Sequence, residues 1–97
     1  MVDENLARFH AIVEGRVQGV GFRFFVKEEA DVLGVTGWVR NRWDDTVEST
    51  AEGERADLEK FIQIVRRGPR SAYVSQVKVD WQENKGEFGG FGIRSTY

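Results

Sequence analysis

The spacing of apolar residues constrains the fold of this chain more than any other feature, because it alternates between a strand repeat and a helix repeat. Between Ala7 and Glu14 the apolar residues fall on every second position, as in a half-buried strand. From Phe22 to Leu33 they are spaced by three and four, and Gly34 stands where a helix normally ends. The first two elements are therefore predicted to be a strand and a helix.

The rest of the chain continues this alternation. A hairpin is predicted next, with strands at Val35 to Asn41 and Thr46 to Glu52 and a turn at Arg42 to Asp45. A second helix is predicted at Gly53 to Arg67, followed by strands at Tyr73 to Trp81 and Phe91 to Thr96. Gly68-Pro69 ends the second helix, and a change of phase near Ser75 and Gln76 predicts a bulge.

This order of elements predicts an α+β, ferredoxin-like βαββαβ sandwich with two helices on one face of an antiparallel sheet and a short extra C-terminal strand. Each strand-helix-strand unit returns in the direction in which it began, so the first two strands run parallel, with a strand of the second unit between them. Their carboxyl ends then share one edge of the sheet. We therefore expect the segment after Glu14 to lie beside Asn41.

A glycine-rich run, Gly15-Arg16-Val17-Gln18-Gly19-Val20-Gly21-Phe22-Arg23, joins the first strand to the first helix. Glycines allow positive φ angles, so successive N–H groups can converge on a small oxyanion at the positive end of the helix dipole. The spacing differs from dinucleotide and Walker motifs, and an ordinary tight connection is the alternative. Arg23 opposes the dipole unless an anion neutralises it. The predicted phosphate cradle is formed by the backbone of Val17, Gln18, Gly19, Val20 and Gly21.

Composition limits the function classes that remain. The 97 residues are enough for one domain, 1–97, with a polar tail at Met1 to Asn5. A net charge of −2 argues against a general nucleic-acid binder, and the absence of cysteine excludes disulfides and thiolate chemistry. We find no apolar span or leader segment, so we expect a cytoplasmic protein without a membrane partner.

The glycine-rich run, together with Gly37-Trp38-Val39-Arg40-Asn41, resembles the two signature segments of the acylphosphatase family. A looser similarity extends to the end of the chain. The resemblance implies a small ferredoxin-like enzyme that hydrolyses the carboxyl-phosphate bond of acyl phosphates without a metal or organic cofactor. It also implies that Arg23 binds the phosphate and that Asn41 positions the attacking water. In one departure, Asp44-Asp45 stands where the family's hairpin usually has aspartate-glycine, which predicts either local strain or a wider loop.

Other residues with possible roles are not assigned to catalysis. His10 is the only histidine and falls on the strand face away from the helices. Trp43, in the turn, is expected to be an exposed aromatic rather than a lining of the acyl pocket, and Arg16 is left out of catalysis. The aromatic residues predicted to fill or flank the core are Trp38, Trp81, Phe61 and Phe91.

Two alternatives of different class are compatible with this order of elements. Ferredoxin-like domains also serve as non-catalytic modules that bind RNA or protein, but this chain has no strand motif of basic and aromatic residues of the RNA-binding kind. The N-terminal part of hydrogenase-maturation carbamoyltransferases also resembles this chain, yet those proteins are far longer. We therefore expect a free-standing, monomeric enzyme whose partner is a small acyl phosphate.

Overall fold

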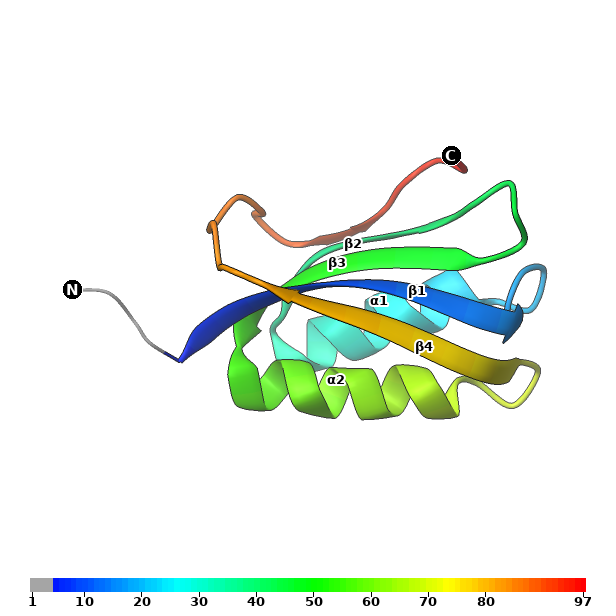
Figure 1. Cartoon of the computed structure of the whole chain (residues 1–97), viewed down its shortest axis with the longest axis horizontal. Coiled ribbons are helices and arrows are strands. Elements are labelled where there is room, and N and C mark those ends of the chain that lie inside the picture. The colour runs from blue at the N-terminus through cyan, green and yellow to red at the C-terminus, as the bar shows by residue number, and fades with distance from the viewer. Residues whose placement is uncertain (1–4) are drawn as a thin grey trace.

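The computed structural model describes residues 5–97, so that most of the expected tail at Met1 to Asn5 lies outside the described residues. The elements in chain order are β1 (Leu6–Arg16), α1 (Phe22–Leu33), β2 (Thr36–Asn41), β3 (Val47–Glu54), α2 (Arg55–Arg67), β4 (Tyr73–Gln82) and β5 (Phe91–Ile93) (Figure 1). This order confirms the predicted succession of strands and helices.

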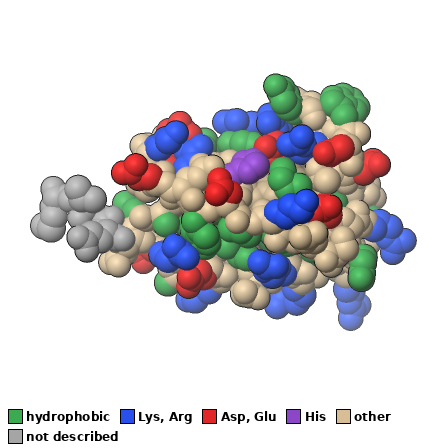
Figure 2. Space-filling view, viewed as in Figure 1, with side chains coloured by type: hydrophobic (Ala, Val, Ile, Leu, Met, Phe, Trp, Pro, Cys, Tyr) green, Lys and Arg blue, Asp and Glu red, His purple; other side chains and the backbone are tan. Residues whose placement is uncertain are grey.

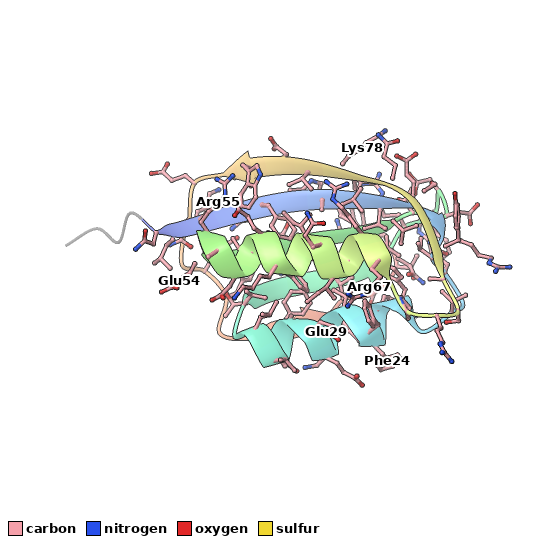
Figure 3. All side chains as sticks on the ribbon, turned by 90° about the horizontal axis from the view of Figure 1, so that it is seen from below. Phe24, Glu29, Glu54, Arg55, Arg67 and Lys78 are labelled. Atoms are coloured by element: carbon pink, nitrogen blue, oxygen red, sulfur yellow. The ribbon has the colours of Figure 1, made fainter. Side chains whose placement is uncertain are left out.

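The strands form one sheet in the order β4-β1-β3-β2-β5, and both helices lie against the same face of it (Figures 1 and 3). Since β3 pairs antiparallel with both β1 and β2, these two strands run parallel with β3 between them, as predicted. The extra strand β5 pairs parallel with β2. The four main strands pair antiparallel, and the predicted extra strand adds one parallel pair at the edge, so the sheet as a whole is mixed.

The boundary between β3 and α2 also differs from the prediction. Gly53 and Glu54 were expected to open the helix, but they extend β3 and pair with Ala7 and Leu6 of β1. The helix begins at Arg55, beside Glu54 at the end of the strand (Figure 3). The longer pairing with β1 outweighs the local tendency of these two residues to start a helix.

The predicted bulge in β4 is present where β4 meets the end of β1. Glu14 lies opposite Gln76 and Gly15 lies opposite Val74, so Ser75 has no residue opposite it. A bulge of this kind bends a strand and increases its twist. It lies opposite Glu14 and Gly15, where β1 leads into the glycine-rich loop.

The hydrophobic core lies between the sheet and the two helices. Phe61 and Phe91 are in it with ring centroids 5.8 Å apart, and Trp81 packs against it. Trp38 is only 8% exposed but is outside this core. Its ring lies under the guanidinium groups of Arg40 and Arg94, at 4.7 and 4.6 Å, so Trp38 is buried and flanks the core, as predicted.

Neither helix within residues 5–97 is both long enough and apolar enough to cross a membrane.

Candidate active site

The loop between β1 and α1 has the backbone conformation expected of an anion cradle. Gly19 and Gly21 have φ angles of 71° and 73°, in the left-handed region that residues with side chains rarely adopt. Within residues 5–97, the N–H groups of residues 18–21 donate no hydrogen bond to another protein group. Gly21 is the N-cap of α1, and no side chain caps this helix end. The loop thus has free N–H groups beside the positive end of a helix.

Three contacts hold this loop from beneath. The Val17 side chain is 1% exposed and lies in the core, while Val20 packs against the core. The Ser71 hydroxyl donates a hydrogen bond of 2.8 Å to the carbonyl oxygen of Val20. Because the Val17 and Val20 side chains are directed inward, the main chain of the loop is free to form its outer surface.

Arg23 is in the first turn of α1 and is half-buried. It forms no hydrogen bond or ion pair with the residues that the structure describes, and no acidic residue is present in the first turn. A cation at this end of a helix is disfavoured by the helix dipole. An anion bound by the loop would remove that penalty, because the guanidinium group can donate two parallel hydrogen bonds to it.

Asn41 is the last residue of β2. Its side-chain Oδ1 is buried and has no hydrogen-bond partner among residues 5–97, whereas its main-chain oxygen accepts a bond of 3.1 Å from the Tyr97 N–H. A buried amide oxygen without a donor costs about 1–3 kcal/mol unless a ligand or water supplies one. The Asn41 carboxamide is therefore available to hold a small hydrogen-bond donor.

The cradle and the end of β2 lie at the same end of the sheet, as the strand order predicted (Figure 1). The two segments are joined by the side chain of Gln18, a residue for which the sequence predicts only a main-chain role. The Gln18 Nε2 donates hydrogen bonds of 2.7 and 2.8 Å to the carbonyl oxygens of Arg42 and Thr46. The predicted site residues from the two segments are thereby brought to one rim.

The turn between β2 and β3 carries the strain expected from Asp44-Asp45. Asp45 has a φ angle of 71° and is the only residue other than glycine with a positive φ among residues 5–97. The Asp44 carboxylate accepts bonds of 3.1 and 2.5 Å from the main-chain N–H and hydroxyl of Thr46. The Thr46 hydroxyl is the main cause of a lowered pKa for Asp44. Across an open groove, Asp45 faces the loop residues Gly15 to Gln18.

His10 lies on the sheet face that the helices leave open, among acidic and basic side chains (Figure 2). Its Nε2 is 2.6 Å from Oε2 of Glu48, whose Oε1 accepts a bond of 2.7 Å from Arg40 Nε. Burial alone would raise the pKa of Glu48, but the hydrogen bonds from His10 and Arg40 outweigh it and lower that pKa. His10 is thus engaged by Glu48.

Two further side chains near the loop and the turn are exposed. Trp43 is 82% exposed in the turn, which confirms the expectation of a loop aromatic, and Arg16 is exposed at the end of β1. Within the described part of the chain, no three His, Cys, Asp or Glu side chains are arranged to hold a metal ion.

The acylphosphatase family profile matches residues 9–93. The chain belongs to the acylphosphatase family. The resemblance drawn from the two motifs is therefore confirmed. Among curated relatives, "Acylphosphatase" of Pelotomaculum thermopropionicum is 52% identical over 87 residues, which cover 90% of this chain and 95% of that protein.

Solved structures with acylphosphatase folds agree with this assignment. The crystal structure of acylphosphatase from Bacillus subtilis matches with a TM-score of 0.88 and 40% identity, and the match covers 91% of this chain and 98% of that one. A full-length HypF structure matches with a TM-score of 0.85 and 31% identity, covering 94% of this chain but 12% of HypF. The acylphosphatase fold therefore also occurs as a small part of a much longer chain.

Proposed function

We propose that this chain hydrolyses acyl phosphates to a carboxylate and inorganic phosphate. Family membership and the names of its relatives support this activity. The observation that carries the proposal is that the two segments meet at one rim. Within residues 5–97, one segment has free main-chain N–H groups and a guanidinium without a partner, and the other has a buried amide oxygen without a donor.

The phosphate group is held by the N–H groups of residues 17–21 and by Arg23. An acyl phosphate has a good carboxylate leaving group, so the task of the protein is to hold the phosphoryl group and stabilise its charge as water attacks in line. The N–H groups and the guanidinium group are donors only, and the conformation of the glycine-rich loop fixes the N–H groups before substrate arrives.

Asn41 positions the attacking water. Its carboxamide has both a donor and an acceptor, so it can orient a water molecule without taking its proton. The Oδ1 atom that lacks a partner is the acceptor for one hydrogen of that water. The new P–O bond forms as the bond from phosphorus to the acyl oxygen breaks, and the electron pair leaves with the carboxylate.

The proton of the water passes to a phosphate oxygen of the substrate. We propose this route because His10, the only histidine and so the usual candidate for a general base, is bound to Glu48 on the open sheet face. Replacement of His10 by alanine should therefore leave turnover within a few-fold of the unmodified protein. Abolished turnover in a folded His10→Ala variant would contradict this route for the proton.

The proposed reaction needs no metal ion or organic cofactor, and we propose that the protein works as a single-domain monomer in the cytoplasm.

The test of the proposed function is benzoyl phosphate hydrolysis in the presence of a chelator, with inorganic phosphate as competitor. Arg23→Ala and Asn41→Ala should each lower turnover by about 10²-fold or more. Unchanged activity in both variants would refute the proposed site, and a requirement for added magnesium would refute the metal-free mechanism.

A further inference from the structure

The Gln18 side chain makes the only described side-chain hydrogen bonds between the cradle and the β2–β3 turn. Its Nε2 bonds to the carbonyl oxygens of Arg42 and Thr46 at 2.7 and 2.8 Å, using both amide hydrogens. These two residues flank the turn, and Arg42 directly follows Asn41. The contact therefore joins the backbone that begins the cradle to the residue next to the proposed water-binding group.

The turn does not need Gln18 in order to close. The Arg42 N–H already donates to the Thr46 carbonyl oxygen at 2.9 Å, and the Asp45 N–H donates to the Arg42 oxygen at 3.3 Å. Each carbonyl oxygen accepts its second bond from Gln18, which lies 24 and 28 residues earlier in the chain. The added bonds fix the turn relative to the cradle rather than its internal shape.

We propose that Gln18 is a positioning residue that holds Asn41 at a set distance from the phosphate cradle. The inference rests on the proposed function, because it concerns the alignment of the bound phosphate with the attacking water. In-line attack requires the two groups to be placed within a fraction of an ångström, and a misplacement of about 1 Å can lower the rate about 10²-fold. Gln18 acts through the turn and through Asn41.

Gln18→Met tests this role, because methionine has a similar length and no N–H donor. We expect kcat for benzoyl phosphate to fall about 10- to 100-fold. The inhibition constant for inorganic phosphate should stay within about two-fold, because the main-chain N–H groups and Arg23 remain in place. The matched control is Gln63→Met on the exposed face of α2, which should leave both constants unchanged.

A double variant separates positioning from phosphate binding. If Gln18 acts through Asn41, adding Gln18→Met to Asn41→Ala should lower kcat by no more than about two-fold further. A full multiplicative loss, or a weakened inhibition by phosphate in Gln18→Met, would overturn the proposal and show that Gln18 contacts substrate directly. Gln18→Met with unchanged kcat would also overturn it, while Arg23→Ala and Asn41→Ala would still report on the proposed function.

Gln18→Lys provides the rescue, since its ammonium group can again donate to two carbonyl oxygens. It should recover at least several-fold of the kcat lost in Gln18→Met. Thermal unfolding of each variant shows whether it is folded under the assay conditions. No recovery in a folded Gln18→Lys variant would contradict the requirement for a donor at this position.

Discussion

Two groups of main-chain N–H donors lie at opposite ends of the sheet, and they are used in opposite ways. At the end away from the cradle, the N–H groups of Lys85, Gly86 and Glu87 bind the Glu52 carboxylate at 2.6, 3.2 and 3.2 Å (Figure 1). At the other end, the N–H groups of residues 18–21 have no acceptor within the described chain. One group binds an anion that belongs to the protein, and the other is left for a ligand.

The side chains at the two ends show the same contrast. Glu52 is 3% exposed and its carboxylate is also 3.4 Å from Arg8, so this buried charge is fully surrounded by donors. At the cradle, the residues that the structure describes offer no carboxylate to Arg23 and no donor to the Asn41 Oδ1. Satisfied polar groups stabilise a fold, whereas unsatisfied ones reduce its stability. The comparison favours a structural role for the Glu52 end of the sheet and supports the proposed site at the cradle end.

The largest expected effect is on activity, from replacement of Arg23. Arg23→Ala should lower kcat/KM for benzoyl phosphate about 10³-fold and weaken inhibition by inorganic phosphate. The free energy of unfolding of Arg23→Ala should be unchanged or rise by about 0.3–1 kcal/mol, because the substitution removes an unpaired cation from a helix N-terminus. Urea unfolding measures this second change. Arg23→Lys is the control, because it keeps the charge without the two-pronged geometry; full activity in it would contradict a specific role for the guanidinium group.

The next effect is on stability, from the opposite end of the sheet. Glu52→Gln places an amide NH₂ among N–H donors and should lower the free energy of unfolding by about 2 kcal/mol. The folded variant should keep its activity. The control is Glu59→Gln on the exposed surface of α2, which should change stability by less than about 0.5 kcal/mol. A Glu52→Gln variant with normal stability and reduced activity would reverse the proposed division between the two ends.

The same carboxylate predicts how stability depends on pH. Burial alone would raise the pKa of Glu52, but main-chain N–H groups of Lys85 and Glu87 and the Arg8 side chain outweigh it and lower that pKa below its ordinary value of 4.5. A carboxyl group with a lowered pKa in the folded state adds stability above its unfolded pKa and loses it as pH falls through the folded pKa. Urea midpoints should therefore fall below about pH 4.5.

Glu48, whose pKa is also lowered, contributes in the same direction. Glu52→Gln should flatten part of this acid dependence, since the group that titrates has been removed. An unchanged slope in Glu52→Gln would mean that this carboxyl group does not account for the loss of stability in acid.

The smallest effect concerns the strained turn beside the cradle. Asp45→Gly should raise the free energy of unfolding by about 1 kcal/mol, because glycine adopts a positive φ without steric cost. Asp44→Gly, the neighbouring control, should instead lower it, because the two bonds to Thr46 are lost. If both substitutions destabilise the protein equally, the strain at Asp45 does not limit stability.

Much of the fold could be predicted because local spacing and chain connectivity agree. The apolar alternation in β1 and the spacing of three and four in α1 place these elements correctly. The return of the chain in the same direction after α1 makes β1 and β2 parallel, which places the cradle and Asn41 at one edge of the sheet. The bulge at Ser75 was visible because it shifts the phase of the strand pattern.

What could not be predicted depends on contacts between distant segments. Gly53 and Glu54 look like a helix start locally, but pairing with β1 keeps them in a strand. The binding of Glu52 by residues 85–87 has no local sequence signal, since a loop far along the chain supplies the donors. The Gln18 bonds were missed for the same reason, although a carboxamide within a loop of small residues is a clue to a side-chain role.

The most direct test of the central claim is to follow main-chain N–H resonances while inorganic phosphate is added. The N–H signals of residues 18–21 should shift and saturate at the concentration that inhibits hydrolysis, and those of residues 85–87 should not move. In Arg23→Ala the shifts should require much more phosphate. Inhibition by phosphate without any shift in residues 18–21 would contradict the claim that these free donors form the substrate site.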